Sequence, residues 1–533
     1  MEMTDRPKQW FGVDRYSWYA LFVLVLVYII NFVDRQLLTI LAVDIKHDLG
    51  ISDAQFGFLY GTAFGVFYAL FGIPLGKLAD RAMRTRVLAT GLALWSAMTA
   101  FSGLSRSFLQ LGTARIGVGV GEATAGPCSY SLLADYFPAH RRATAVAIFS
   151  SGIYLGGGFS LYIGTAIAGG WNHAFPLGAR PFGLAGWQAA FLAVGLPGLA
   201  LAFWVRSLRE PIRGRFETPP ADGLPRPAPQ PATLAAFVRD LAAIVPPFTL
   251  FAAARRGRTA LLGNLAIATG LAVFGTVLSF LIGDPVQWVA LGIGTYAIAS
   301  WAVALRYDDP EAFRVIWASR SVVGLNLGYG LMCVITYANS AFGPSLVIRE
   351  FGASAGAVAL IVGGSAAIGG ALGVIAGGAL GDRLAGDRHH SRRILVVIVA
   401  LLTSLVPNCI MLATHSLTVV YICVFPMWFL ASCALGGAAG TIVNIVPATT
   451  RATATAAFFL FATMIGLALG PYAAGKISGA FGANLRIGLA GILVVVPFAL
   501  VALEVCRRDL VRRERSKATA APAHTGPTRS RAI

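Results

Sequence analysis

Long apolar runs separated by short polar segments make up most of this chain. A helix needs about 20 consecutive apolar residues to cross the hydrocarbon core of a bilayer, and the sequence contains fourteen runs of about that length. The predicted spans are residues 18–41, 54–75, 87–104, 108–133, 143–168, 184–205, 260–282, 286–305, 322–346, 355–380, 394–413, 418–442, 453–477 and 487–505. The even number places both chain ends on one side of the membrane. The pattern therefore predicts an all-α polytopic membrane protein.

The spacing of the runs divides the chain into five parts. Residues 1–205 form a predicted N-terminal six-helix bundle, 206–259 a cytoplasmic connector, 260–305 two extra transmembrane helices, 306–506 a C-terminal six-helix bundle and 507–533 a basic cytoplasmic tail. The connector is rich in Pro and Arg. Its one amphipathic stretch, residues 233–245, is expected to lie on the membrane surface.

Composition narrows the class of protein. Hydrophobic residues make up 56% of the 533 residues and charged residues only 12%, against roughly 25% charged residues in soluble domains. These values exclude a soluble globular enzyme and a disordered chain. The six Cys residues are scattered without a CxxC pair, so the sequence indicates neither a metal site nor a cofactor.

The basic charge is distributed unevenly across the predicted membrane. The net charge is +18, and most Lys and Arg residues fall in tails and loops that the spans place on one side. This is the positive-inside signature. It predicts cytoplasmic N- and C-termini and attraction to anionic membrane lipids, not nucleic-acid binding. The excess of Arg over Lys is typical of a GC-rich bacterial genome, which favours the bacterial inner membrane.

Two motifs occur twice, in the same order. Residues 76–81 (GKLADR) and 378–383 (GALGDR) both read G-x-L-x-D-R where they leave the second and tenth spans. Residues 138–145 (PAHRRATA) and 447–454 (PATTRATA) both read P-A-x-x-R-A-T-A where they enter the fifth and thirteenth spans. The copies lie 302 and 309 residues apart. This repetition predicts two six-helix halves of parallel orientation, related by an axis along the membrane normal.

These motifs resemble those of a known family. G-x-L-x-D-R followed by Arg84 and Arg86 resembles the inner-loop signature of the major facilitator superfamily, and R-x-x-x-G-x-G-x-A at 115–123 resembles its helix-four motif. Residues 31–35 (NFVDR) and 121–123 (GEA) are similar to the spinster family of carriers for lipid-like solutes. The resemblance implies a major-facilitator fold and alternating-access transport.

The sequence departs from the resemblance in two places. Spinster-type proteins usually have twelve spans, so residues 260–305 are additional. The fifth span contains G-x-x-x-G-G-G at 152–158 but lacks the Gly-Pro pair of the superfamily's antiporter motif, whereas G-x-x-x-G-P at 466–471 in the thirteenth span resembles it. This departure weakens an antiport interpretation.

The duplicated inner loops suggest a gate. An Arg in the first turn of a helix meets the positive end of the helix dipole and needs a carboxylate nearby. We therefore hypothesise a crossed latch, in which Asp80 pairs with the start of the thirteenth span and Asp382 with the start of the fifth. The alternative is that these residues are solvated loop charges that only set topology. The predicted latch comprises Gly76, Asp80, Arg81, Arg84, Arg142, Asp382, Arg383 and Arg451.

Four formal charges lie deep within predicted spans: Asp34, Arg35, Arg115 and Glu122. Each costs at least about 2.5 kcal/mol at mid-membrane, so each needs a partner or a water-filled cavity. Packing the first span beside the fourth brings Asp34 near Arg115 or Glu122. Because no His lies in a span, a coupling proton must bind Asp34 or Glu122. The alternative is a structural ion pair that fastens the two helices.

The second half contains neutral polar residues in place of these charges. One charged wall and one apolar wall suit an amphiphile with an anionic head, in agreement with the spinster resemblance. A second-half wall that merely faces lipid would be equally apolar. The candidate substrate and charge-pair residues are Asn31, Arg35, Arg115, Asn326, Tyr329 and Tyr337.

The sequence therefore predicts a monomeric secondary transporter, coupled to protons, for a lipid-like or other organic anion. Transport of a polar small molecule such as a sugar, sugar acid or aromatic acid is the alternative, as is a transport-inactive receptor or scaffold. A membrane-embedded enzyme is not expected, because GxSxG and HExxH motifs are absent.

Overall fold

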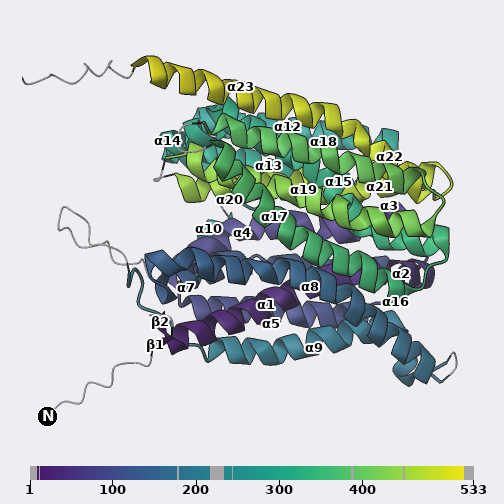
Figure 1. The fold of residues 1–533 in the computed structure, drawn as a ribbon. Helices are drawn as coiled ribbons and strands as arrows, with labels where there is room; N and C mark the ends of the chain where they lie inside the picture. The colour runs from purple at the N-terminus through teal and green to yellow at the C-terminus, as the bar shows by residue number, and fades with distance from the viewer. Residues whose placement is uncertain are drawn as a thin grey trace, which may run out of the picture.

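A computed structural model describes residues 9–10, 13–176, 179–216, 233–242, 244–385, 389–447 and 450–520. Almost all of these residues are helical, and most helices run in roughly the same direction in Figure 1. A short antiparallel pair, β1 (Gln9–Trp10) and β2 (Val13–Asp14), precedes the first helix. Eleven helices of the described residues are long and apolar enough to cross a membrane, so the chain is a multi-pass membrane protein.

The first bundle, drawn in purple and blue in Figure 1, contains the helices up to residue 206. Its elements are α1 (Arg15–Ile40), α2 (Ala42–Leu49), α3 (Asp53–Gly57), η1 (Phe58–Thr62), α4 (Ala63–Arg81), α5 (Arg84–Ser102), α6 (Phe108–Glu122), α7 (Ala125–Tyr136), α8 (Ala139–Ala174), η2 (Pro181–Gly183) and α9 (Gly186–Arg206). Within it, α1 packs along α8, and α5 packs between α6 and α9.

The second bundle, drawn in green and yellow, contains the helices from residue 310 onward. Its elements are α14 (Pro310–Phe313), η3 (Arg314–Ala318), α15 (Arg320–Phe351), α16 (Ala355–Val358), η4 (Ala359–Gly363), α17 (Gly364–Ala385), α18 (Ser391–Ala413), α19 (Leu417–Ile445), α20 (Arg451–Phe461), η5 (Ala462–Leu467), α21 (Ala468–Ala480), α22 (Leu485–Gly491), η6 (Ile492–Val495) and α23 (Val496–Ala520). Here α19 packs between α17 and α18, and α15 packs on α23.

Between the bundles in sequence lie four helices: α10 (Leu234–Ala242), α11 (Thr249–Arg256), α12 (Arg258–Ile282) and α13 (Pro285–Asp308). The last two pair as a hairpin, which we call the added hairpin. The predicted amphipathic stretch corresponds to α10. Sequence patterning did not predict α11, whose Thr249 hydroxyl donates to the Tyr296 hydroxyl of α13 (2.9 Å).

The helix is interrupted within the fourth predicted span, 108–133. The chain turns at residues 123–124, between α6 and α7. Pro127 has no N–H to continue the helical hydrogen bonds across this point, and the Thr124 hydroxyl donates to the Gly121 carbonyl (2.8 Å). The break lies directly after Glu122, so it fixes where that carboxylate points.

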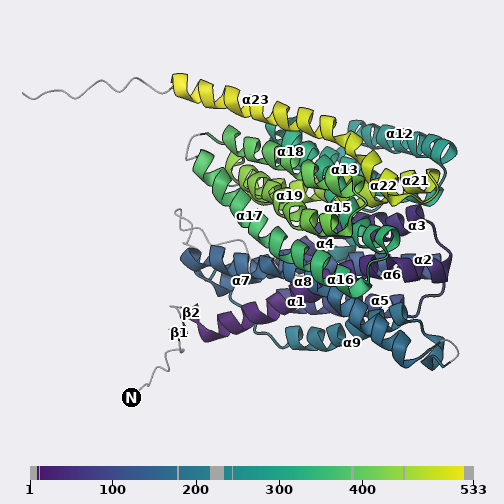
Figure 2. The ribbon, with the colours of Figure 1, turned by 45° about the vertical axis from the view of Figure 1, so that its right-hand side comes forward.

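The two bundles meet through polar contacts at one end, near α2, α3 and α22 (Figures 1 and 2). Asp53 at the start of α3 accepts from the Ser478 hydroxyl (2.8 Å) and from Arg349 (3.4 Å), both in the second bundle. The Tyr60 hydroxyl donates to the Ser340 hydroxyl of α15 (3.2 Å). We call this the closed end. At the opposite end, α7 and α17 diverge in both views.

Glycines allow the close approach at the closed end. A Cβ at Gly57 would lie 2.4 Å from the Pro471 carbonyl oxygen, and one at Gly61 would lie 2.2 Å from that of Leu467. No side chain fits at either distance. The backbone of α3 and η1 therefore lies directly against that of η5 and α21, and this contact joins the first bundle to the second.

Candidate functional site

An ion pair joins α1 to α6 in the interior of the first bundle. The Arg35 guanidinium donates to Glu122 Oε2 (2.7 Å), and the Glu122 side chain is fully buried. The Arg35 guanidinium also lies over the rings of Phe32, Phe64 and Tyr68, at 4.8, 4.4 and 5.4 Å from their centroids. Three aromatic faces and one carboxylate hold this cation in place, as cation–π geometry favours.

The neighbouring charges are left with spare hydrogen-bonding capacity. Asp34 is fully buried, and neither of its carboxylate oxygens has a hydrogen-bond partner within the described residues. Arg115 is buried with its Nε and Nη2 unpaired on the same basis. Asp34 nevertheless lies within electrostatic range of Glu122 and Arg115. The structure thus brings together all four charges singled out from the sequence, but only Arg35 and Glu122 bond directly.

Asn31 and Tyr337 also lie beside this cluster. Asn31 is buried on α1 and faces Glu122. Tyr337 of α15 lies within electrostatic range of Arg35, so it brings the second bundle to the charges. Gln36, which follows Arg35 on α1, accepts a hydrogen bond from the Ser340 hydroxyl of α15 (3.2 Å). The cluster therefore lies at the interface between the bundles.

The other two substrate candidates lie elsewhere. Tyr329 stacks on Phe458 at 4.8 Å between ring centroids, which is packing inside the second bundle. Asn326 is buried, and its amide has no hydrogen-bond partner among the described residues. Within the described part of the chain, neither forms a hydrogen bond or ion pair with the charged cluster.

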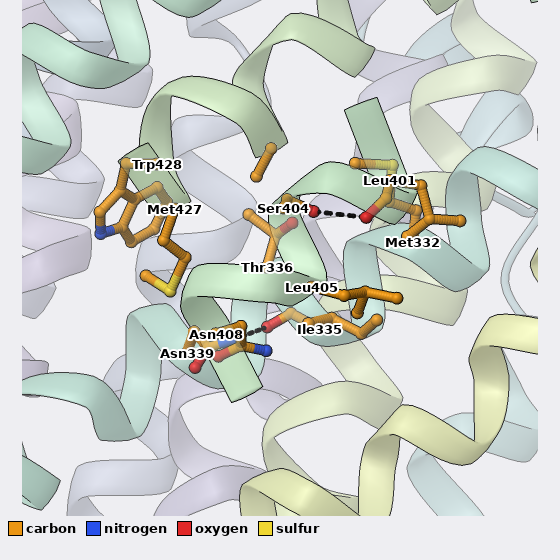
Figure 3. Close-up of a pocket in the computed structure, with 11 residues that line it drawn as sticks. Met332, Ile335, Thr336, Asn339, Leu401, Ser404, Leu405, Asn408, Met427 and Trp428 are labelled. Atoms are coloured by element: carbon orange, nitrogen blue, oxygen red, sulfur yellow. Dashed lines mark hydrogen bonds between the residues drawn. The ribbon is translucent and has the colours of Figure 1, made fainter. Parts of the chain in front are cut away.

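The second bundle contains a largely apolar pocket between α15, α18 and α19 (Figure 3). The cavity is small, with a volume of about 20 Å³, and it lies between side chains that include Met332, Leu405 and Trp428. Two buried amides face this space, Asn339 and Asn408, and in both the Oδ1 atom lacks a hydrogen-bond partner in the described part of the chain. Sequence reasoning counted Asn339 among the neutral polar residues of the second half but missed Asn408, although it too is an Asn within a predicted span.

The inner-end residues make contacts within their own bundle. Arg84 bonds Glu210 (2.7 Å) and also Asp135, all in or next to the first bundle. Asp382 pairs with Arg393 at the start of α18 (2.8 Å). Gly76 and Arg81 lie in the last turns of α4, and Arg383 is exposed at the end of α17. The side chains of Asp80, Arg142 and Arg451 lie outside the described residues, so the crossed latch stays a prediction.

Two glutamates that sequence reasoning missed occupy matching places in the two bundles. Glu210, after α9, accepts from the Thr85 N–H and hydroxyl (3.0 Å each). Glu514, in α23, accepts from the Ser391 N–H (2.8 Å) and hydroxyl (2.7 Å). A carboxylate at a helix start satisfies its free N–H groups. The signal in sequence is a Glu shortly after the sixth and last spans.

The donors around Glu210 determine its protonation. Burial acts to raise the pKa of this carboxyl, but hydrogen bonds from Thr85 and Arg84 outweigh it and hold the pKa below the ordinary value of 4.5. Glu210 is therefore negatively charged at neutral pH, and this charge offsets the positive charge of Arg84 beside it.

Comparison with known proteins identifies the family. The model of the Major Facilitator Superfamily matches residues 24–345 and 325–531, which together cover most of the chain. The chain belongs to the major facilitator superfamily. Its helical bundles and its duplicated inner-loop motifs are those of a member of this superfamily.

Several curated members of the superfamily are similar over part of their length. An MFS-type efflux pump of Mycolicibacterium smegmatis is 36% identical over 188 residues, 35% of this chain and 41% of the relative. The probable galactarate/D-glucarate transporter GudP of Bacillus subtilis is 32% identical over 202 residues, 36% of this chain and 41% of the relative. Protein spinster of Drosophila melanogaster is 26% identical over 40% of this chain and 33% of its own. The match thus spans about two fifths of the length of these relatives, or less.

Solved structures share the fold over almost the whole chain. A bacterial homologue of the human lysosomal transporter Spinster, in an inward-facing and unoccupied conformation, has a TM-score of 0.68 at 24% identity, covering 94% of this chain and 99% of that one. A peptide transporter POT has a TM-score of 0.61 at 15% identity, covering 94% and 97%. At these identities the likeness establishes the fold alone.

Proposed function

We propose that this protein is a secondary active transporter that works by alternating access, is coupled to protons, and carries a lipid-like or other organic anion. One observation carries the proposal: buried charges with unused donors line the first bundle, and a largely apolar pocket lies in the second. An amphiphile with an anionic head satisfies both surfaces, because its head pairs with arginine and its body stays in an apolar environment.

The charges suggest how a proton and an anion are coupled. Arg35 and Arg115 balance Asp34 and Glu122 when all four are ionised. Asp34 is fully buried and its carboxylate oxygens have no hydrogen-bond partner among the described residues, so a proton bound there removes the cost of burying its charge. Protonation of Asp34 leaves the cluster with one excess positive charge and free donors on Arg115. In this mechanism the proton and the anion bind together, and loss of the proton releases the anion.

A second substrate class is a polar sugar acid. One of the relatives named above supports this alternative, since it is described as a probable galactarate/D-glucarate transporter and its match covers 36% of this chain. The spinster similarity and the apolar pocket support the lipid-like class. Both classes carry an acid group, so the charged cluster serves either one.

The proposal includes an architecture of fourteen spans. Besides the eleven candidate helices, α5, α6 with α7, and α8 are proposed to cross the membrane, which gives six spans, the added hairpin and six more. The proposal also retains the predicted domain limits, the cytoplasmic N- and C-termini, the location in a bacterial inner membrane and the monomeric state. Matching elements support two related halves: the π-helical segments η1 (58–62) and η4 (359–363) start 301 residues apart, close to the 302 of the inner-loop motif.

In this architecture the closed end is the outer one, and the structure is an inward-facing state. The crossed latch is then expected to form only in the outward-facing state, when the inner ends of the bundles approach. The ion pairs Asp382–Arg393 and Arg84–Glu210 would replace the latch in the inward-facing state.

Transport by the full-length protein in proteoliposomes tests the proposal. We expect uptake of a lysophosphatidylglycerol probe, or of galactarate, to be driven by a pH gradient and to stop when a protonophore dissipates it. Asp34→Asn should abolish accumulation against a gradient but retain binding, because a permanently neutral side chain keeps the excess positive charge. Asp44→Asn on the exposed surface of α2 is the matched control and should transport normally.

The outcomes separate the parts of the proposal. Gradient-driven uptake that persists in Asp34→Asn contradicts coupling through Asp34. Uptake of galactarate but not of the lysolipid rejects the lipid-like class. If neither probe moves in the wild-type protein while both bind, transport itself is rejected.

A further inference from the structure

The added hairpin contacts both bundles rather than lying beside one of them. The hairpin helix farther from the bundles, α12, has no buried residues in its most apolar 18-residue stretch. Its inner helix, α13, packs on η1 and α4 of the first bundle and on η5 of the second. An apolar cluster here combines Val66 of α4, Ala297 of α13, Met464 of η5 and Ile244 of the connector. The hairpin thus covers the line where η1 and α4 meet η5 and α21.

A buried amide on α13 bonds to both bundles at one point. Gln287 is 1% exposed. Its Oε1 accepts from the Thr62 hydroxyl of η1 (2.7 Å), and its Nε2 donates to the Ala468 carbonyl of α21 (3.4 Å). The Ala468 carbonyl oxygen also lies 2.7 Å from Thr62 Oγ1, so it shares the single hydroxyl proton of Thr62 with Gln287 Oε1. When the two bundles separate at this end, Gln287 must lose one of its partners.

An ion pair on the loop of the hairpin adds a second connection. Asp284 Oδ2 accepts from Lys476 Nζ (2.6 Å) and from the Tyr472 hydroxyl (3.1 Å), both on α21. The Trp288 ring packs edge-on against the Tyr472 ring, with 5.6 Å between the centroids. These contacts lie within one helical turn of Gln287, so all polar contacts between the hairpin and α21 are concentrated at the closed end in the described part of the chain.

We propose that the added hairpin is a clasp that holds the closed end shut. It bonds α21 through Asp284 and Gln287 while it packs on η1 and α4, so separation of the bundles there has to break contacts to one side. The clasp therefore raises the population of the closed-end-shut state over the opposite state. This proposal rests on the alternating access proposed above, since it needs two interconverting states.

Distances across the closed end test the clasp in full-length protein in lipid nanodiscs. Spin labels are placed at His47→Cys on α2, whose side chain is 89% exposed, and at Gly479→Cys on α21, where a Cβ meets no other atom within 4 Å. The native Cys409 and Cys433 are replaced by Ser. Asp284→Asn and Gln287→Leu should each raise the ratio of the long-distance to the short-distance population about two- to tenfold, as expected for loss of one ion pair or buried hydrogen bond.

Two further variants keep the test decisive. Thr276→Val on α12 removes a hydroxyl that bonds only within its own helix, and it should leave the ratio unchanged. The charge-exchanged pair Asp284→Lys with Lys476→Asp should return the ratio toward the wild-type value, whereas either change alone should not. This rescue excludes a general loss of folding as the cause.

The results also distinguish the clasp from alternating access. A single distance in the wild-type protein under all conditions, with and without a pH gradient, contradicts alternating access. Two distances whose ratio is the same in wild type, Asp284→Asn and Gln287→Leu contradict the clasp alone.

Discussion

The two bundles share a fold but bury different chemistry. The charged cluster of the first bundle buries Asp34, Arg35, Arg115 and Glu122, of which Asp34 has no hydrogen-bonded partner in the described residues. The second bundle instead buries two amide side chains beside its pocket, those of Asn339 and Asn408. Burying a charge in a membrane costs more than burying an amide. The energetic cost of function is therefore concentrated in one bundle.

The bundles are alike where the chain leaves the membrane interior. Thr85 and Ser391 each open a helix, and each donates an N–H and a hydroxyl to a glutamate from the end of its own bundle. This duplicated contact stabilises helix starts and involves no residue of the charged cluster. The comparison teaches that the ends opposite the closed end keep the repeated framework while the middles have diverged.

The largest expected effect comes from removing a charge in the first bundle. Arg35→Gln leaves Glu122 buried without its cation and should lower the free energy of unfolding by about 3–5 kcal/mol. Denaturant unfolding in detergent measures it. Arg35→Gln combined with Glu122→Gln should recover most of the loss. A single variant as stable as wild type would mean that the ion pair is already compensated by water.

A smaller loss should follow from adding one methyl group in the second bundle. A Cβ at Gly377 of α17 would lie 2.0 Å from the Cys433 carbonyl oxygen of α19, whereas one at Gly378 meets nothing within 4 Å. Gly377→Ala should destabilise by about 1–3 kcal/mol through overpacking. Gly378→Ala, its neighbour, should be neutral or stabilising by up to about 1 kcal/mol. Equal thermal stability of the two variants would show that α17 and α19 are less closely packed.

The matching glutamates should differ in the size of their effect. Glu210→Gln should cost about 1–2 kcal/mol at neutral pH, and Glu514→Gln less, because Glu210 also accepts from Arg84. The pKa of Glu210 is lowered in the folded protein. The contribution of Glu210 to the free energy of unfolding is therefore complete above pH 4.5, and it is lost as the pH falls through the lowered pKa.

Stability measured across pH checks this prediction. The difference between wild type and Glu210→Gln should stay constant from pH 7 to pH 5 and shrink below about pH 4. A difference that grows as the pH falls would mean that the folded protein prefers the protonated acid.

The smallest effect is a gain in stability. Asn408→Leu replaces a buried amide whose Oδ1 lacks a hydrogen bond with an apolar side chain of similar volume. It should raise the free energy of unfolding by about 0.5–1 kcal/mol. Thermal unfolding measures it. A loss of more than 1 kcal/mol would show that a bound water or solute satisfies this oxygen.

Sequence patterning predicted the features that depend on composition and period. Apolar runs located the helices, and the two duplicated motifs indicated the internal repeat before any fold was known. Scarcity singled out the candidate site: Asp34, Arg35, Arg115 and Glu122 are conspicuous because few charges lie within the runs. Each of these inferences needs only the identity of a residue and its depth in a span.

Features that depend on three-dimensional approach were beyond the sequence. Which arginine bonds Glu122 is decided by the turn at residues 123–124 and by the rings around Arg35. The contact between Gly57 and the Pro471 carbonyl joins positions 414 residues apart. The position of Gln287 between two bundles follows from neither its own helix nor its neighbours. Periodicity carries no information about such contacts.

The added hairpin lies on one side of the molecule, so the two boundaries between the bundles are covered differently. On one flank, α13 lies over the boundary between α4 and η5. On the other flank, α8 meets η4 and α17, with Gly158 close to Gly363. Among the described residues the added hairpin packs along the first boundary and not along the second. For the amphiphilic substrate proposed above, the two flanks would therefore differ in their exposure to lipid, and the hairpin would give the protein a defined front and back within the plane of the membrane.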